Sequence, residues 1–294
     1  MPQQRKAFLP LADADILAYE ACFAGQFFDK ETKEKVILPF HLVRDRLDQK
    51  VREIMTSLNT PLEPIMFLTG ETNFRDAIAI KKGYKANRDH SKKPYHLANA
   101  RAYIRARYNT ILSRGCEADD MLCVAQTKYN REFLAGETNV ESVICTRDKD
   151  LRQCEGWHYG WEMGDQPEFK LQWVDKLGTL EAVYKEGVSK KTGKPTRSFH
   201  KLKGTGDKWL YSQILMGDMV DNIPGLPNMG GGTAFKLIDP CETLEELAAV
   251  VKGEYQRVYE DRWEVELYEQ AHLVYMVRNL DENNQLIFWR LPES

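Results

Sequence analysis

The sequence predicts an α/β fold in which a mostly parallel sheet is flanked by helices, with a smaller helical subdomain after it. Short apolar runs of strand length alternate along the chain with stretches in which apolar residues recur every three or four positions. Strands that alternate with helices favour a parallel sheet, and ligands are then expected beyond the carboxyl ends of the strands. The predicted strands are 7–12, 64–69 and 141–146, and the predicted helices are 40–58, 97–113 and 117–135.

The segments differ in the strength of their patterns. The runs 64–69 and 141–146 are continuous and apolar, as expected for strands that are buried on both faces. The run 7–12 is weaker because Pro10 lies inside it and Pro lacks a backbone N–H. In 40–58, an apolar stripe predicts an amphipathic helix. The stripe consists of Leu42, Val43, Leu47, Val51, Ile54, Met55 and Leu58.

The pattern changes after about residue 155. Aromatic-rich, irregular sequence is followed by a Lys/Gly-rich segment, 188–208, which looks like a flexible hairpin, and helical patterns then run to the C-terminus. We therefore expect an α/β core at 1–160, which includes a basic segment at 81–107. The remainder, 161–294, is expected to hold an insertion and a helical subdomain that completes the site.

Composition and charge are those of an ordinary globular protein, with 43% hydrophobic and 29% charged residues. The net charge is −3, which excludes a surface that is basic throughout but allows a local basic patch. No apolar run approaches the ~18 residues of a membrane span. The apolar stretch after Lys6 is interrupted by Asp13 and Asp15 before the core of a signal peptide can form. We expect a cytoplasmic protein without membrane contact.

The cysteines show no CxxC pair and no spacing typical of zinc ligands. Reduced and mostly buried thiols are therefore expected. They are Cys22, Cys116, Cys123, Cys145, Cys154 and Cys241.

Carboxylates gather at four places in the chain. Taken singly, each group has an ordinary structural explanation, because acids are favoured in the first turn of a helix and Asp is common in turns. Brought together, the groups would repel one another and raise their own pKa values unless a cation neutralised them. They are Asp13 and Asp15, then Glu117, Asp119 and Asp120, then Asp148 and Asp150, and finally Asp218 and Asp221.

Two of these groups are expected to meet. Asp13 and Asp148 emerge at the same edge of the sheet if their strands are parallel, and Glu117 and Asp120 share one face of a helix. Oxygen ligands without nearby His or Cys suit Mg²⁺ or Mn²⁺. Two such ions ~3.5–4 Å apart are the usual device for in-line displacement at a phosphodiester. The sequence therefore predicts a two-metal site.

Positive charge is concentrated in two segments. In 81–107, a solvated helix face explains the later arginines, but nothing balances the charge of the loop 81–93 except Asp89. For 188–208, a DNA contact and a solvated hairpin are both open. Basic segments with interleaved tyrosines beside an acidic metal site fit a phosphate-backbone substrate whose bases are stacked. The residues are Lys81, Lys82, Lys85, Arg88, Lys92, Lys93, Arg101, Arg105 and Arg107, with Tyr84, Tyr95 and Tyr103, and then Lys190, Lys191, Lys194, Arg197, Lys201, Lys203 and Lys208.

A Pro/Gly-rich segment, 223–234, lies between helical stretches. Its glycines would let backbone N–H groups approach a phosphate closely at the N-terminus of a helix. The candidate contacts are Gly225, Gly230, Gly231, Gly232 and Thr233.

Four motifs follow one another along the chain: Tyr84-Lys-Ala-Asn-Arg88, Gly115-Cys-Glu-Ala-Asp-Asp120, Thr146-Arg-Asp-Lys-Asp-Leu151 and Met216-Gly-Asp-Met-Val-Asp-Asn-Ile-Pro-Gly225. This order resembles the 5′-nuclease superfamily, which includes bacteriophage 5′→3′ exonucleases, flap endonucleases and the 5′-nuclease domains of bacterial DNA polymerases. The resemblance covers most of 10–240. It is strongest to the phage exonucleases, which share an ending like Leu286-Ile-Phe-Trp-Arg290.

The resemblance implies a PIN-like α/β core with two divalent metals, Mg²⁺ or Mn²⁺. It also implies a helix–hairpin–helix at about 212–238 that holds duplex DNA, commonly with a monovalent cation such as K⁺. The implied activity is hydrolysis of phosphodiester bonds from DNA 5′ ends, in phage DNA replication, recombination or primer removal within the host cytoplasm. The implied substrate is double-stranded or branched DNA with a 5′ end, and replication proteins are candidate partners.

Matching motifs carry the family's site residues onto this sequence. Asp13, Glu117 and Asp119 would serve the first metal. Asp148, Asp150 and Asp221 would serve the second, with Asp120 and Asp218 in or beside these ligand sets. Lys85 and Arg88 would act on the scissile phosphate, and Tyr84 would stack on a terminal base. Beside these, the charge pattern of the basic segment makes Lys81, Lys82, Lys92, Lys93, Arg101 and Arg105 candidate DNA contacts, together with the glycine turn.

Two departures from the family pattern leave alternatives open. The family usually has an Asp at the end of the second strand, where this sequence has Gly70 or Glu71. Either Glu71 substitutes as a metal ligand or the first metal loses one. Only the segment 89–114 separates Arg88 from Gly115, which is short for the arch of flap endonucleases. The alternatives are a flap endonuclease, a PIN-type ribonuclease, and a non-catalytic protein that binds DNA structures. A flap endonuclease or RNase H-like activity in addition to the exonuclease is also left open.

Overall fold

The computed structural model describes residues 7–188 and 192–292, and the segment containing Lys190 and Lys191 lies outside them. Its centre is a six-stranded sheet in the order β5-β4-β1-β6-β7-β8, parallel except where β8 joins β7. The strands are β1 (Ala7–Asp13), β4 (Ile65–Leu68), β5 (Thr110–Leu112), β6 (Val140–Cys145), β7 (Gly156–Gly160) and β8 (Phe169–Val174). The predicted α/β fold class is confirmed.

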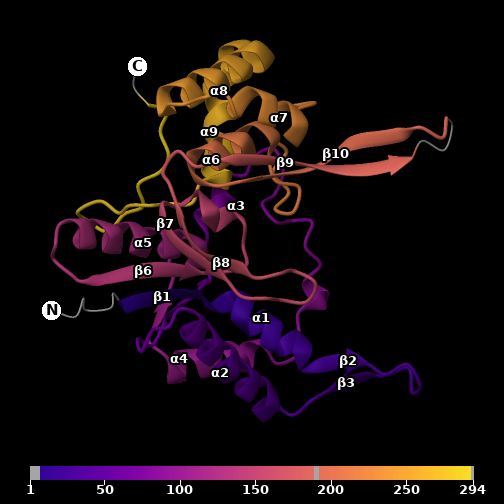
Figure 1. Ribbon diagram of the computed structural model, residues 1–294, viewed down its shortest axis with the longest axis vertical. Helices are drawn as coiled ribbons and strands as arrows, with labels where there is room; N and C mark the ends of the chain where they lie inside the picture. Colours follow the sequence, from indigo (N-terminus) through magenta and orange to yellow (C-terminus); the bar gives the residue numbers. More distant parts are fainter. Residues whose placement is uncertain (1–6, 189–191, 293–294) are drawn as a thin grey trace.

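Helices cover both faces of this sheet (Figure 1). Alternate residues of β1 and β6 point to opposite faces, as the period of a strand requires. Leu11 and Ile144 pack toward α5, whereas Ala12 and Val143 pack toward α1, α2 and α4. The helices are α1 (Ala14–Ala24), α2 (Phe40–Ser57), α4 (Leu97–Arg107) and α5 (Ala118–Leu134).

Three local features differ from or refine the sequence-based expectation. The helix predicted at 97–113 ends at Arg107, because Tyr108 is extended and leads into β5. The sequence after residue 155, expected to be irregular, forms β7 and β8 and widens the sheet. Pro10 is accommodated in a central strand because the pairing of β1 with β4 begins only at Leu11.

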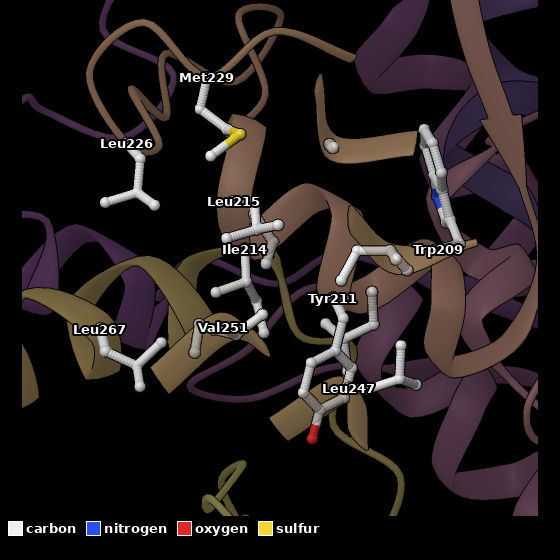
Figure 2. Close-up of a cluster of buried hydrophobic side chains, with 14 of the residues drawn as sticks. Trp209, Tyr211, Ile214, Leu215, Leu226, Met229, Leu247, Val251 and Leu267 are labelled. Atoms are coloured by element: carbon white, nitrogen blue, oxygen red, sulfur yellow. The ribbon is translucent and has the colours of Figure 1, made fainter. Parts of the chain in front are cut away.

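The C-terminal helices form a second core on the α5 side of the sheet (Figure 1). In this core, α6 contributes Trp209, Ile214 and Leu215, which pack with side chains of the following turn and helices (Figure 2). The helices are α6 (Gly206–Met216), α7 (Gly231–Ile238), α8 (Leu244–Tyr259) and α9 (Trp263–Val274). The helix–turn–helix of α6 and α7 lies where the sequence predicts a helix–hairpin–helix.

Two hairpins project from the body of the protein (Figure 1). One joins β2 (Gln26–Phe28) to β3 (Lys35–Ile37), and the other joins β9 (Leu180–Val188) to β10 (Pro195–Gly204). The remaining elements are the short helix α3 (Phe74–Ile78) and the 3₁₀ turns η1 (His90–Lys92), η2 (Asp150–Gln153) and η3 (Glu260–Arg262). Within the described residues, no helix has both the length and the apolar character needed to cross a bilayer.

The cysteines correct one expectation. Cys123 of α5 and Cys154 after η2 form a disulfide, whereas reduced thiols were expected at both positions. The sequence does not reveal this pair because the two cysteines lie 31 positions apart, and the fold brings them together in the core between α5 and the sheet. The other four cysteines are free and buried, as predicted.

Candidate active site

The carboxyl ends of β1 and β6 place two of the predicted acids beside each other. Asp13 ends β1 and caps α1, because its Oδ1 accepts the N–H of Ile16 at 3.1 Å. Its Oδ2 accepts the hydroxyl of Thr146 at 2.8 Å. The same hydroxyl oxygen accepts the N–H of Asp148 at 3.0 Å. Thr146, to which the sequence analysis gave no role, therefore links the two acid-bearing strand ends.

Asp119, at the start of α5, completes an acidic trio with Asp13 and Asp148. Burial raises the pKa of Asp13 to about 7, with further contributions from Asp15 and Asp148. Burial and then the charges of Asp13 and Asp148 raise the pKa of Asp119 well above its usual range. Burial is also the main cause of the raised pKa of Asp148. In the described part of the chain, no Lys or Arg lies within ion-pair distance of this trio.

A second pair of predicted acids is neutralised by the predicted basic residues. Lys85 Nζ donates to Glu117 Oε1 at 2.5 Å and lies 3.6 Å from Asp221 Oδ2. Arg88 donates to Asp221 Oδ1 at 2.6 Å. The hydroxyl of Tyr84 donates to Glu117 at 2.9 Å and also lies 3.2 Å from Asp221. These contacts join the first, second and fourth sequence motifs in one place.

Backbone contacts hold the loop around Lys85 against the 216–225 turn. The backbone N–H of Lys85 donates to the carbonyl of Asp221 at 2.9 Å, and the side-chain amide of Asn87 donates to the backbone carbonyl of Met219 at 3.0 Å. The amide of Asn222 donates back to the carbonyl of Gly83 at 2.8 Å. Lys85 itself has a φ of +52°, a left-handed conformation that is uncommon for a residue with a side chain and often marks a functional site.

A third group contains two residues that sequence reasoning missed. Lys149 donates to Asp218 at 2.7 Å and lies 3.4 Å from Asp150. The amide of Gln213, on α6, donates to Asp150 at 2.7 Å. Burial and the charge of Asp148 nevertheless raise the pKa of Asp150 to about 7. The position of Lys149 between two aspartates was the available signal for its role, whereas nothing in the sequence distinguishes Gln213 from other helical polar residues.

Asp120 faces away from the acidic trio and is fully buried against Arg75. Arg75 donates to both of its oxygens, at 2.7 and 2.9 Å. The N–H groups of Glu117 and Val277 also donate to Asp120, at 3.0 and 2.9 Å. A carboxylate has about four acceptor sites, and all four are used here. In this position Asp120 supports Glu117 from beside the ligand set, which is one of the two places that the resemblance left open for it.

The end of β4 is occupied by residues that carry no charge. Asp13 pairs with Phe67 in the sheet, so the next positions of β4 lie beside the acidic trio. Leu68 is fully buried there. Thr69 turns its hydroxyl toward the N–H of Ala118 and accepts it at 3.0 Å, at the first turn of α5. The end of β4 therefore holds a buried Leu and a helix-capping Thr, and Gly70 and Glu71, to which the family's Asp position was assigned, follow them.

Gly70 and Glu71 turn away from that place. A Cβ at Gly70 would lie 2.1 Å from the carbonyl oxygen of Ser113, so no side chain fits at this position. Glu71 is exposed, and within the described residues it makes no hydrogen bond or ion pair to the acidic cluster. The structure thus does not bring Glu71 to the site for which it was predicted as a substitute ligand.

Tyr84 makes contacts beyond its expected role. Its side chain is only 9% exposed and belongs to the C-terminal core, while its hydroxyl contacts the acids described above. The ring is largely covered in this position, and its stacking on a terminal base stays a prediction. Burial is the main cause of the raised pKa of its hydroxyl, so Tyr84 stays neutral and acts as a hydrogen-bond donor to the carboxylates.

Two predicted DNA contacts are engaged within the protein. Lys81 forms an ion pair with Glu266 and donates to the hydroxyl of Tyr259 at 2.8 Å. Arg101 forms an ion pair with Asp15 and a hydrogen bond to the carbonyl of Thr69. The other predicted basic contacts of this segment, Lys82, Lys92, Lys93 and Arg105, are exposed.

The glycine turn divides into two parts. Gly225 has a φ of +64°, and its N–H donates to Gln270 at 2.9 Å, so this residue shapes the turn and its N–H is not available to a phosphate. The other predicted contacts surround the N-terminus of α7, where they are exposed or half-buried: Gly230, Gly231, Gly232 and Thr233.

The donors of the site suit a hard divalent cation. In the positions seen, no three Asp, Glu, His or Cys side chains of the described chain lie close enough together to hold an ion. All the donors are oxygen atoms, as Mg²⁺ and Mn²⁺ prefer. Burial is the main cause of the raised pKa values of Asp13, Asp119 and Asp148, and the charges of Lys85 and Lys149 offset it only in part. On the chemistry of the donors, the residues present fit such an ion.

The acidic trio and Asp150, whose pKa values are all raised mainly by burial, predict a pH-dependent stability of the metal-free protein. Carboxyls with a raised folded pKa hold protons that the unfolded chain has released, so stability falls as pH rises through the folded pKa. His158 and His272, whose pKa values burial lowers, act in the opposite sense only below about pH 6.5. We expect the free energy of unfolding, measured with urea in a chelator, to fall by about 1–2 kcal/mol between about pH 6.5 and 8.

Divalent ions should oppose this loss, because a ligand that binds only the folded state stabilises it. Urea unfolding at pH 8 with and without Mg²⁺ measures the effect. Unfolding free energies that were flat from pH 6.5 to 8, or unmoved by Mg²⁺ and Mn²⁺ at pH 8, would contradict the assignment of the trio as an uncompensated cation site.

A mostly parallel sheet with clustered carboxylates at the carboxyl ends of its strands, completed by a helical subdomain, has the architecture expected of PIN-like nucleases. No known family model matches the chain. It is 26% identical over 257 residues to DNA polymerase I of Bacillus subtilis (strain 168), covering 84% of this chain and 24% of the polymerase. It is also 27% identical over 158 residues to a 5′-3′ exonuclease of the same organism, covering 52% of this chain and 44% of that protein.

The fold is similar to that of the bacteriophage T5 flap endonuclease, solved in a complex with DNA and metal ions. The TM-score is 0.54 at 15% identity, and the match covers 91% of this chain and 88% of that one. These findings confirm the resemblance to the 5′-nuclease superfamily. The chain spans about a quarter of the length of the polymerase and less than half of the exonuclease that it matches.

Proposed function

We propose that this protein is a divalent-metal-dependent 5′→3′ nuclease that hydrolyses phosphodiester bonds at DNA 5′ ends. The observation that carries the proposal is the acidic trio, in which strand and helix ends bring together buried carboxylates that form no ion pair with a Lys or Arg of the described residues. Clustered carboxylates of this kind are arranged for cation-assisted chemistry at phosphates. The names of the similar proteins support the same reaction class.

In this proposal, Asp13, Glu117 and Asp119 hold one divalent ion, and Asp148, Asp150 and Asp221 hold a second, with Asp218 beside them. Bound Mg²⁺ or Mn²⁺ would supply activation of a water nucleophile and neutralisation of the leaving oxygen. Lys85, Arg88 and Lys149 occupy several of these carboxylates in the structure. We infer that Lys85 and Arg88 turn to the substrate phosphate when metal ions replace them on the carboxylates.

Lys85 is suited to this task by its surroundings. Burial lowers its pKa, but the charges of Glu117 and Asp221 outweigh burial and keep the ammonium group protonated. A fixed positive charge of this kind stabilises the negative charge that develops on a phosphate in the transition state. The backbone hydrogen bond to Asp221 holds the loop in place, so that this charge is positioned before the substrate arrives.

The finer parts of the proposal concern the substrate. We infer an exonuclease of the phage type that acts on duplex DNA in replication, recombination or primer removal, and helix–hairpin–helix contacts from α6 and α7 that bind K⁺ and the duplex. A flap endonuclease with the same chemistry remains the nearest alternative function. The loop between Arg88 and Leu97 is short and leads directly into α4, which favours the exonuclease.

The deciding experiment is digestion of 5′-labelled blunt, nicked and flapped DNA duplexes and an RNA–DNA hybrid side by side, with Mg²⁺, Mn²⁺ or a chelator. Release of mono- or oligonucleotides from blunt and nicked 5′ ends, dependent on metal, supports the exonuclease. Cleavage confined to the flapped duplex supports the flap endonuclease, and cleavage of only an RNA–DNA hybrid supports the ribonuclease. Binding without any cleavage by the pure protein would leave a DNA-structure-binding protein and overturn the proposal.

Replacing Lys85 with Ala should reduce the single-turnover rate at saturating DNA by roughly 10²–10³-fold, because it removes an electrostatic donor from the reacting phosphate. The dissociation constant should change little. Lys82→Ala, which removes an exposed charge from the same loop, serves as the control and should leave the saturated rate nearly intact. Rapid-quench kinetics of the two variants make the comparison. A Lys85→Ala enzyme that lost affinity but kept its rate would place Lys85 among simple DNA contacts.

A further inference from the structure

The hairpin of β9 and β10 is docked to the helical subdomain at its base. A Cβ built on Gly231 would lie 3.0 Å from the ring of Phe199 and 3.3 Å from Cβ of Leu202, so both side chains pack on the first turn of α7. Gly204 similarly lies against Trp209 of the C-terminal core. The base of the hairpin is therefore fixed beside the α7 N-terminus.

The outer half of the hairpin extends beyond this anchor (Figure 1). Tyr184 pairs with Phe199 in the sheet, and β9 continues for four more residues to Val188 while β10 begins at Pro195. Four residues of strand span about 13 Å. All the described residues of this outer half are exposed. The hairpin is thus an arm with a fixed base, which includes Phe199, and a free outer half, the latter defined as 184–188 and 194–198.

The free outer half carries ordered positive charge. The guanidinium of Arg197 lies 4.3 Å from the ring centroid of Tyr184, and this ring packs edge-on against Phe199 with centroids 6.1 Å apart. Lys185 and Lys194 add two exposed charges, and Glu186 is the one acid of the described outer half. A cation held on an aromatic face is preoriented and loses less freedom on binding an anion.

We propose that this arm is a second duplex-binding element, which contacts the DNA phosphates beyond those held at α7. The proposal rests on the proposed function, since it concerns the same DNA. Phosphates of one strand are about 3.4 Å apart along the duplex axis, so a reach of about 13 Å corresponds to about four base pairs. The occupant is a polyanion because the outer half is basic in a chain with a net charge of −3. The fixed position beside α7 favours duplex DNA over an acidic protein.

The test compares a charge-deleted arm with a matched control. The arm variant is Lys185→Gln, Lys194→Gln and Arg197→Gln together. The control removes three exposed charges from the α2 and α5 helices, as Arg52→Gln, Lys128→Gln and Arg131→Gln. Binding in a chelator is measured by fluorescence anisotropy on labelled duplexes lengthened in steps of about four base pairs, at several salt concentrations.

In the wild type, affinity should rise with duplex length until the arm is covered. The arm variant should not gain affinity from the final increase in duplex length. The slope of its log binding constant against log salt concentration should fall in magnitude by about 0.9 for each phosphate contact removed. The control should keep both. A second variant, Phe199→Ser, keeps every charge but frees the base of the arm, and it should lose the same rise. Thermal unfolding verifies that each variant is folded.

The outcomes separate this inference from the proposed function. If the wild type cleaves DNA but the folded arm variant keeps the length dependence and the salt slope, the arm does not bind DNA and the inference is wrong. A loss of affinity equal in the arm variant and the control would also overturn it, because general charge would then be responsible. If the wild type neither binds nor cleaves any duplex, the proposed function itself fails.

Discussion

Replacing Asp119 with Asn should abolish DNA cleavage and at the same time stabilise the metal-free protein. The substitution removes one charge from the acidic trio, in which burial and the charges of Asp13 and Asp148 raise the pKa of Asp119. Loss of a metal ligand removes several kcal/mol of transition-state stabilisation, which corresponds to about 10³-fold or more in rate. Relief of the repulsion should raise the free energy of unfolding in a chelator at pH 8.

Two readouts check this prediction together: single-turnover cleavage, and urea unfolding at pH 8 as Mg²⁺ is added. The variant should be more stable than the wild type in chelator and gain less stability from Mg²⁺. Glu71→Gln is the matched control, because it removes a nearby but exposed acid and should alter neither readout. Near-normal cleavage by Asp119→Asn would exclude the trio from the metal site. An elevated Mg²⁺ requirement in Glu71→Gln would restore that residue as a ligand.

The opposite effects on activity and stability follow from the way the strands end. β1 and β6 are adjacent and parallel, so their carboxyl ends bring Asp13 and Asp148 together whatever the side chains prefer. The hydroxyl of Thr146 then holds both segments in place. Local backbone structure therefore holds these carboxylates close to one another, and either protonation or a bound cation relieves their repulsion.

The parts of the fold that were predicted correctly are those with strong local patterns. The apolar runs became β1, β4 and β6, and the amphipathic stripe at 40–58 became α2. β5 and β7 were missed because their patterns are short, with only Thr110–Leu112 in β5 and a His inside β7. These strands form because neighbouring strands supply their hydrogen bonds, which is tertiary information that propensity does not contain.

The site was predicted in the same uneven way. The sequence placed most of the acids at strand and helix ends, and the structure brings seven of the predicted ones into one region: Asp13, Glu117, Asp119, Asp148, Asp150, Asp218 and Asp221. The sequence could not distinguish exposed side chains from those that form contacts within the protein. Tyr84, Lys81 and Asp120 were interpreted from their motifs, but their roles depend on contacts with segments more than 30 residues away.

Arg75 illustrates why such contacts escape sequence reasoning. It is a single Arg in the short helix α3, with no repeat or charge pattern around it, yet it is fully buried. Besides Asp120, its guanidinium donates to the carbonyls of Leu273 and Tyr275, at 3.0 and 2.6 Å, where α9 ends. One side chain therefore joins α3, α5 and the C-terminal segment, and through Asp120 it fixes the N–H of Glu117.

Replacing Arg75 with Met should cost about 3–5 kcal/mol of folding free energy, because it leaves Asp120 as an unpaired charge in the interior. The side chain of Met keeps most of the apolar volume, so the loss reports the ion pair and the two carbonyl bonds. Urea unfolding of Arg75→Met, Asp120→Asn and the double variant forms the cycle. The double variant should be clearly more stable than the sum of the single losses predicts, as expected for residues in direct contact.

Arg105→Met, an exposed arginine on α4, provides the control and should change stability by less than about 0.5 kcal/mol. The Mg²⁺ concentration that the folded variants require for DNA cleavage is a second measurement. If Asp120 positions Glu117, the double variant should require more Mg²⁺ for cleavage than the wild type even where its stability is largely recovered. Single variants that lost less than about 1 kcal/mol, or losses that simply added in the double variant, would show that the Arg75–Asp120 pair does not hold the two parts of the protein together.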